Sequence, residues 1–132
     1  ITKRNPLKAE SKTPISKKIK DCKKIIGINS FIKVKFYENI IKSNKTIDLI
    51  NYLKKNKNIE IFFLMGADNL ISFHKWHKSK LISQKCNIIV FDRHGYKKNS
   101  LKSKTFKRLN NKTLTFVESK KVNISSSQLR KI

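Results

Sequence analysis

The feature that most constrains the fold is an uninterrupted apolar run at residues 61–65, which ends at Gly66. A run this short, without polar alternation, is typical of a strand buried on both faces, as in a parallel sheet. Asp68 and Asn69 then provide side chains that favour a helix start, and apolar residues continue at helical spacing to Trp76. In open α/β sheets, this order of strand, glycine, acid and helix places ligands at the carboxyl ends of the strands.

Gly66 and Asp68 allow two interpretations. Glycine lets the backbone approach a ligand, and a carboxylate can accept hydrogen bonds from ribose hydroxyls, so the pair could belong to a nucleotide site. Alternatively, the segment is an ordinary turn between a strand and a helix, in which Asp68 only caps the helix. The turn taken alone does not separate these interpretations.

The net charge of +24 is the most unusual bulk property of the chain. Only four of the 32 basic residues are arginine, and the abundant lysine, asparagine and isoleucine all use codons rich in adenine and thymine. We therefore interpret much of the charge as nucleotide bias on solvated surfaces. A nucleic-acid-binding protein more often concentrates arginine among aromatic residues, so we expect no specific nucleic-acid partner, only weak binding to polyanions at low salt.

The length of 132 residues fits one domain, and no apolar stretch approaches the length of a membrane helix. Cys22 and Cys86 are isolated thiols, which suits a reducing compartment, and no signal peptide is visible, so we expect a cytoplasmic protein. His74 and His77 are three residues apart without a third ligand, and we expect no protein-bound metal.

The other elements are predicted from hydrophobic spacing. Thr46 is expected at the N-cap of a helix, and the basic segment 97–112 has too weak a pattern for an assignment. Helices are expected over residues 15–28, 46–57 and about 68–83, and strands over residues 31–36, 61–65, 87–92 and 114–117. This alternation predicts an α/β fold with a mainly parallel sheet.

A serine-rich segment near the C-terminus offers a phosphate site. Serine hydroxyls and unpaired backbone N–H groups at a helix N-terminus bind anions, and Arg130 could add bidentate hydrogen bonds. The alternative is a capping box, because Ser125 and Gln128 have its spacing.

Arg93 and Trp76 also have two interpretations each. Arg93 follows an apolar strand and either faces a phosphate or pairs with a surface acid. Trp76 either packs in the core or presents its ring to a planar ligand. No catalytic triad, paired carboxylates or Walker-type glycine loop is visible.

Taken together, five segments resemble bacterial nicotinate mononucleotide adenylyltransferase over nearly the whole chain. They are Asn5-Pro6-Leu7-Lys8, Thr46-Ile47-Asp48, Gly66-Ala67-Asp68-Asn69-Leu70 with Trp76, Arg93-His94-Gly95-Tyr96, and Ile124-Ser125-Ser126-Ser127-Gln128-Leu129-Arg130. The resemblance implies a Rossmann-like nucleotidyltransferase fold and adenylyl transfer from ATP to nicotinate mononucleotide. The products would be deamido-NAD, a precursor in NAD biosynthesis, and pyrophosphate, with Mg²⁺ accompanying ATP.

The resemblance also implies the roles of individual residues. Gly66 and Asp68 would contact the adenosine ribose, whereas Arg93, Ser126 and Arg130 would face the ATP phosphates. Trp76 would stack on the nicotinate ring, and Thr46 would help to receive the nicotinate carboxylate through backbone amides. The phosphate of one substrate attacks the other in line, so no protein nucleophile is needed and no catalytic residue is assigned.

One departure from the family is large. Its members open with a strand and a Gly-Gly-Thr-Phe-Asp-Pro-x-His-x-Gly-His-like motif, whose histidines stabilise the transferring phosphates, and this chain does not contain it. We therefore expect an N-terminally truncated domain that lacks the first strand and helix, with an exposed strand edge and apolar face. We also expect poor turnover. An inactive remnant of the enzyme and a basic nucleic-acid-binding module stay open as alternatives.

Overall fold

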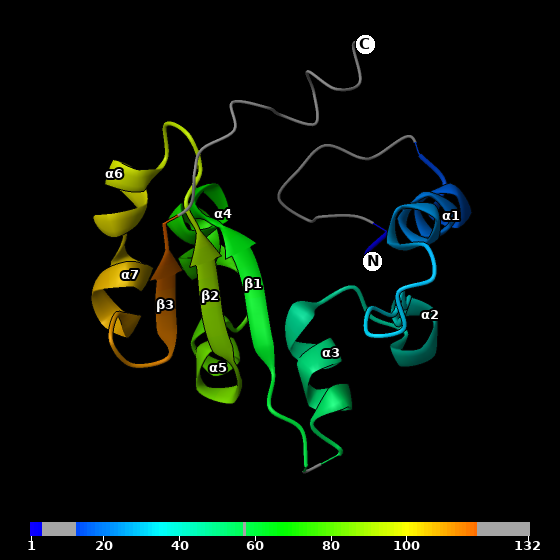
Figure 1. The fold of residues 1–132 in the computed structure, drawn as a ribbon. Coiled ribbons are helices and arrows are strands. Elements are labelled where there is room, and N and C mark those ends of the chain that lie inside the picture. The colour runs from blue at the N-terminus through cyan, green and yellow to red at the C-terminus, as the bar shows by residue number, and fades with distance from the viewer. Residues whose placement is uncertain (4–12, 57, 119–132) are drawn as a thin grey trace. The chain divides into compact units, whose positions relative to one another are not determined.

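The computed structural model describes residues 1–3, 13–56 and 58–118, and the chain divides into two compact units, residues 1–57 and 58–132 (Figure 1). Each unit is described by itself, and the single domain expected from the chain length stays a prediction. The expected turn at residues 5–8 and the serine-rich segment at residues 124–130 lie outside the described residues.

The first unit contains three described helices: α1 (Ile15–Ile26), α2 (Glu38–Ile41) and α3 (Thr46–Leu53). The predicted end of α1 is confirmed, because Gly27 adopts a positive φ of 59° and its N–H donates to the Lys23 carbonyl.

The start of α3 differs from the prediction. Lys45 is the N-cap residue and Thr46 is already helical, so the expected cap at Thr46 is wrong. The polar groups before the helix explain the shift. Ser43 Oγ accepts a hydrogen bond from the Lys45 N–H (3.2 Å) and donates one to Asp48 Oδ2 (2.6 Å). Ser43 therefore links the N-cap residue Lys45 to Asp48 in the first turn of α3.

Residues 31–37 form neither a helix nor a strand, so the strand expected over residues 31–36 is wrong. A strand requires a hydrogen-bonded neighbour, and the described part of the first unit contains no other strand. The segment instead contacts the chain start through its backbone, where the Ile1 ammonium group donates to the Lys35 carbonyl at 3.0 Å.

The second unit is built on a parallel sheet, which confirms the predicted α/β class. Its described strands are β1 (Phe62–Gly66), β2 (Asn87–Phe91) and β3 (Leu114–Val117), in that spatial order. The register pairs Gly66 with Phe91 and Phe91 with Val117, so all three strands end at the same edge. We call this carboxyl edge the rim.

Short helices connect the strands. The β1–β2 connection holds α4 (Ala67–Ser72), the 3₁₀ helix η1 (Phe73–Lys75) and α5 (Ser79–Lys85), and the β2–β3 connection holds α6 (Lys97–Leu101) and α7 (Lys104–Leu109). Ser103 caps α7 by accepting a hydrogen bond from the Phe106 N–H at 3.1 Å. Among the described helices, none is long and apolar enough to cross a bilayer.

The core of the second unit lies between the sheet and these helices, and Figure 1 shows α4 and α5 behind the strands. Its large apolar side chains without exposed surface are Leu70, Phe73, Ile82, Ile88 and Val90. Burial of each such side chain stabilises the fold by about 1.5–3 kcal/mol. The core therefore holds α4 against β1 and β2, and α4 carries the acid that follows Gly66.

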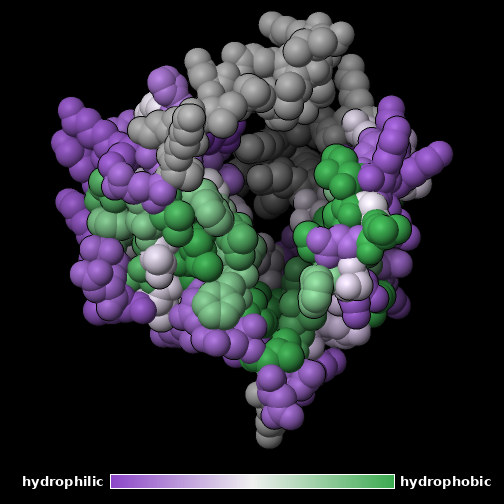
Figure 2. Space-filling model, viewed as in Figure 1, coloured by the Kyte–Doolittle hydropathy of each residue, from purple (hydrophilic) through white to green (hydrophobic). Residues whose placement is uncertain are grey.

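The opposite face of the sheet is exposed. Phe62, Leu64 and Phe91 are 50%, 56% and 40% exposed, and Figure 2 shows hydrophobic side chains gathered over the strands. The strand predicted at residues 61–65 is thus present but buried on one face only, so its expected burial on both faces is wrong. The described helices of the unit pack on the other face.

Two leucines of this unit allow a matched test of the core. Leu70→Ala, at a fully buried site, should lower the free energy of unfolding by about 2–5 kcal/mol. Leu64→Ala removes the same atoms from the exposed face and should cost less than about 1 kcal/mol. Urea denaturation of both variants measures the difference, and equal costs would contradict the one-sided core.

Candidate nucleotide site at the strand ends

The first part of the site is the turn from β1 into α4. Gly66 is the N-cap residue of α4, with φ −81° and ψ 157°, and Asp68 lies in the first turn of the helix. The Asp68 side chain folds back over the glycine, and a Cβ on Gly66 would lie 2.6 Å from Asp68 Oδ1. The backbone angles suit any residue, so glycine is needed here because of the space that the carboxylate occupies.

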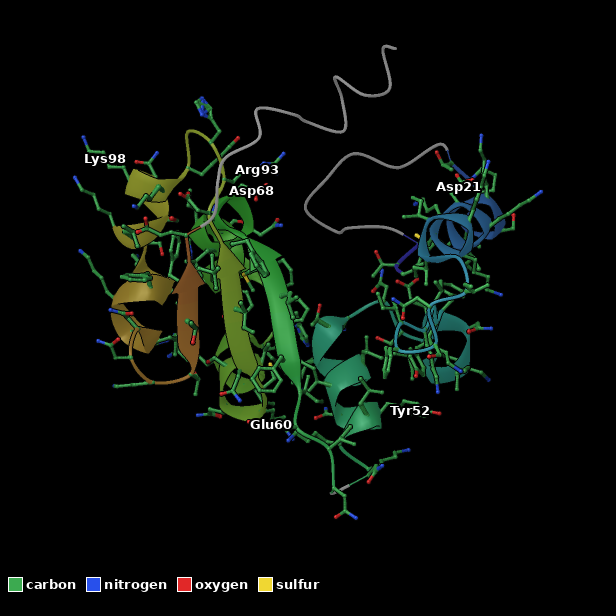
Figure 3. The ribbon with its side chains drawn as sticks, in the orientation of Figure 1. Asp21, Tyr52, Glu60, Asp68, Arg93 and Lys98 are labelled. Carbon is green, nitrogen blue, oxygen red and sulfur yellow. The ribbon has the colours of Figure 1, made fainter. Side chains whose placement is uncertain are left out.

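Arg93 supplies the second part from the end of β2. Its Nη1 donates to Asp68 Oδ2 at 2.6 Å, and Figure 3 shows the two side chains at the rim. The pairing follows from the parallel register: Gly66 and Phe91 are partners, and Asp68 and Arg93 each lie two residues further on. The side chains are 15% and 44% exposed, which places the pair at the solvent boundary.

The two oxygens of the Asp68 carboxylate differ in their hydrogen bonds. Oδ2 accepts the charge-assisted hydrogen bond from Arg93, whereas Oδ1 is buried and has no hydrogen-bond partner among the described residues. The backbone N–H groups at the start of α4 add a favourable dipole for a negative side chain in the first turn. The carboxylate therefore has unused capacity to accept hydrogen bonds.

In the structure, Asp68 does not cap the helix. The N-cap position belongs to Gly66, and α4 has no side-chain cap hydrogen bond. For Arg93 the alternative of a paired acid is present, and the acid is Asp68 itself rather than an unrelated surface residue.

A second ion pair lies beside the first. Lys97 Nζ contacts Glu118 Oε1 at 2.7 Å, joining the start of α6 to the residue after β3. The hydrogen bond that Lys97 donates to the Glu118 carboxylate, together with the negative charge of that carboxylate, raises the pKa of Lys97, which therefore stays protonated. The connection that follows β2 thus supplies two basic side chains, Arg93 and Lys97, and each is paired with an acid that follows a neighbouring strand.

Trp76 lies in a different environment. Its ring packs against Phe73, with centroids 5.4 Å apart, and edge-on against Phe63 of β1 at 5.9 Å. Its indole Nε1 is buried without a hydrogen-bond partner among the described residues. The core interpretation of Trp76 is therefore realised in this structure, and stacking on a planar ligand stays a prediction.

The remaining candidates are not joined to the pair by the structure. Thr46 begins α3 in the first unit, where its N–H is one of those that a helix leaves without an internal partner. Ser126 and Arg130 lie outside the described residues. In the described ranges, no three side chains of histidine, cysteine, aspartate or glutamate gather as metal ligands.

Sequence reasoning missed the contribution of Tyr96. The Arg93 guanidinium lies over the Tyr96 ring, 5.8 Å from its centroid, and Arg93, Tyr96 and Asp68 form one contact series. A signal was present, since Gly95 suits a tight turn that brings a residue at position 96 back toward position 93.

Comparisons with known proteins identify the family of the chain. Residues 1–132 match the cytidylyltransferase-like family. The chain is 65% identical over 132 residues to the probable nicotinate-nucleotide adenylyltransferase of Pelagibacter ubique (strain HTCC1062), covering all of this chain and 73% of that protein. It is 34% identical over 97 residues to the protein of that name from Agrobacterium fabrum (strain C58 / ATCC 33970), covering 72% of this chain and 51% of that protein.

A solved structure supports the fold. The Plasmodium falciparum nicotinic acid mononucleotide adenylyltransferase complexed with NaAD matches with a TM-score of 0.69 and 21% identity, covering 99% of this chain and 65% of that chain. The chain belongs to the cytidylyltransferase-like family. Within that family, the relatives that it is similar to are nicotinate-nucleotide adenylyltransferases, which confirms the resemblance drawn from the five sequence segments.

The contact between Gly66 and Asp68 can be tested by a double-mutant cycle. Gly66→Ala should lower the free energy of unfolding in the native background, because the new Cβ displaces a carboxylate that Arg93 holds. In an Asp68→Ala background the clash is gone, and the same change should be neutral or stabilising. The two effects should differ by about 1 kcal/mol, measured by urea denaturation. Identical effects in the two backgrounds would show that Asp68 does not occupy this space.

Proposed function

We propose that the chain carries out adenylyl transfer from ATP to nicotinate mononucleotide in the cytoplasm, forming deamido-NAD and releasing pyrophosphate. The observation that carries the proposal is the rim pair, in which a carboxylate after β1 and a guanidinium after β2 lie at one edge of a parallel sheet. This edge is where open α/β sheets bind nucleotides. The relatives named above carry this activity in their names.

The ATP side of the proposed site uses both charges of the pair. Gly66 leaves room for the Asp68 carboxylate, which accepts hydrogen bonds from the ribose hydroxyls. Arg93 faces the phosphates, where a guanidinium can make bidentate contacts, together with Ser126 and Arg130.

The mononucleotide side uses an aromatic ring and a helix start. Trp76 stacks on the nicotinate ring, whose planar face suits an indole. Thr46 lies at the start of α3, whose unpaired N–H groups favour the nicotinate carboxylate.

The reaction needs positioning and charge neutralisation rather than a protein nucleophile. An oxygen of the mononucleotide phosphate attacks the α-phosphorus of ATP, a new P–O–P link forms, and pyrophosphate leaves with the electrons of the broken bond. Mg²⁺ enters as part of the MgATP substrate, with phosphate oxygens and water as its ligands, and it offsets phosphate charge.

Nucleotide preference tests the function directly. ATP and nicotinate mononucleotide should both bind the chain, and CTP should bind more weakly than ATP, as measured by isothermal titration calorimetry. Mass spectrometry of a mixture with both substrates should detect at most slow formation of deamido-NAD, because the histidine motif of the family is not in this chain. A chain that prefers CTP, or binds neither substrate, would contradict adenylyl transfer to this mononucleotide.

Substitution of Trp76 tests the mononucleotide side of the proposed site separately from the ATP side. Trp76→Ala should weaken binding of nicotinate mononucleotide about tenfold or more, because stacking on an aromatic ring is lost, while ATP binding is unchanged. Trp76→Phe is the matched control, since a ring remains to contact Phe63 and Phe73. Equal losses for both ligands in Trp76→Ala would show that the residue acts only through the core.

A further inference from the structure

We propose that Arg93 is a positioning residue: it holds the Asp68 carboxylate in the orientation that receives the ribose of ATP. The inference rests on the proposed function and adds to it, because a phosphate contact alone does not require Arg93 to touch Asp68. In the structure the two side chains meet at 2.6 Å through Nη1 and Oδ2.

Asp68 has little freedom while this contact exists. Its Oδ1 is buried against Gly66, and a single added carbon on that glycine would lie 2.6 Å from it. Its Oδ2 is fixed by the guanidinium on the other side. With contacts on both oxygens and the side chain only 15% exposed, the carboxylate is held in one orientation instead of sampling several rotamers.

The guanidinium is itself positioned by a tight turn. The Tyr96 N–H donates to the Arg93 carbonyl at 3.0 Å, and Gly95 supplies the positive φ of 80° that such a turn needs at its third residue. The turn brings the Tyr96 ring to 5.8 Å from the guanidinium carbon. Arg93 therefore reaches Asp68 from a defined direction.

The positive charge of Arg93 also affects how Asp68 interacts with the phosphates of ATP. A bare carboxylate beside a triphosphate repels it, and the paired guanidinium offsets that repulsion. Arginine carries five N–H donors, and the contact with Asp68 engages only Nη1, so the residue can hold Asp68 and still face a phosphate. Arg93 thus couples the ribose end of the ligand to its phosphate end.

Adenosine is the probe that isolates the positioning role, because it has both ribose hydroxyls and no phosphate. Arg93→Gln should weaken adenosine binding about three- to fivefold, since the carboxylate is no longer held. Arg93→Lys should recover part of the loss, because an ammonium group can still pair with Asp68. Binding of 2′,3′-dideoxyadenosine, which offers Asp68 no hydroxyl, should be the same in all three proteins. Dissociation constants come from NMR titration of the full 132-residue chain.

Lys98→Gln is the matched control for charge, since it removes one positive charge from the neighbouring helix α6, where Figure 3 shows the side chain pointing away from the pair. It should leave adenosine binding unchanged. If Arg93→Gln weakens ATP binding but leaves adenosine binding intact, Arg93 acts on phosphate only and the positioning role is overturned. If the unaltered chain binds CTP as tightly as ATP, or binds neither ATP nor adenosine, the proposed function itself fails, and the inference falls with it.

Discussion

The parallel pairing of β1 with β2 is the constraint on which the rest of the second unit depends. Parallel strands end at the same edge, so two turns that are 25 residues apart in the chain come to lie side by side. Buried side chains on one face, such as Phe73 and Ile88, hold α4 against these strands. The ion pair of Asp68 and Arg93 is a consequence of this register, and a slip by one residue would point the two side chains apart.

The sequence predicted those elements whose signal is local and strong. The apolar runs that became β1, β2 and β3 were located within one or two residues, and Gly27 marked the end of α1. The strand expected at residues 31–36 failed because alternation describes one segment, whereas a strand needs a partner. The helices α6 and α7 were missed because they are short and depend on tertiary contacts such as the burial of Thr105 and Leu109.

The sequence predicted individual residues of the candidate site, because their signals are local, but it did not predict how these residues contact each other. Position after a strand end singled out Asp68 and Arg93 separately, because glycine and charge at such ends are visible in a linear sequence. Their direct contact was not predicted, since it depends on the register of two strands. Trp76 had two interpretations, and only its neighbours Phe63 and Phe73 show that the ring is used in packing.

The exposed apolar face of the sheet favours association between copies of this chain in concentrated solution. Phe62, Leu64 and Phe91 would adhere to similar surfaces on other molecules, and β1 has only β2 as a neighbour among the described strands. A net charge of +24 keeps like molecules apart by mutual repulsion. Screening shortens the reach of that repulsion to about 10 Å at 0.1 M salt. The abundant lysines therefore act as a colloidal stabiliser, whose protection declines as ionic strength rises.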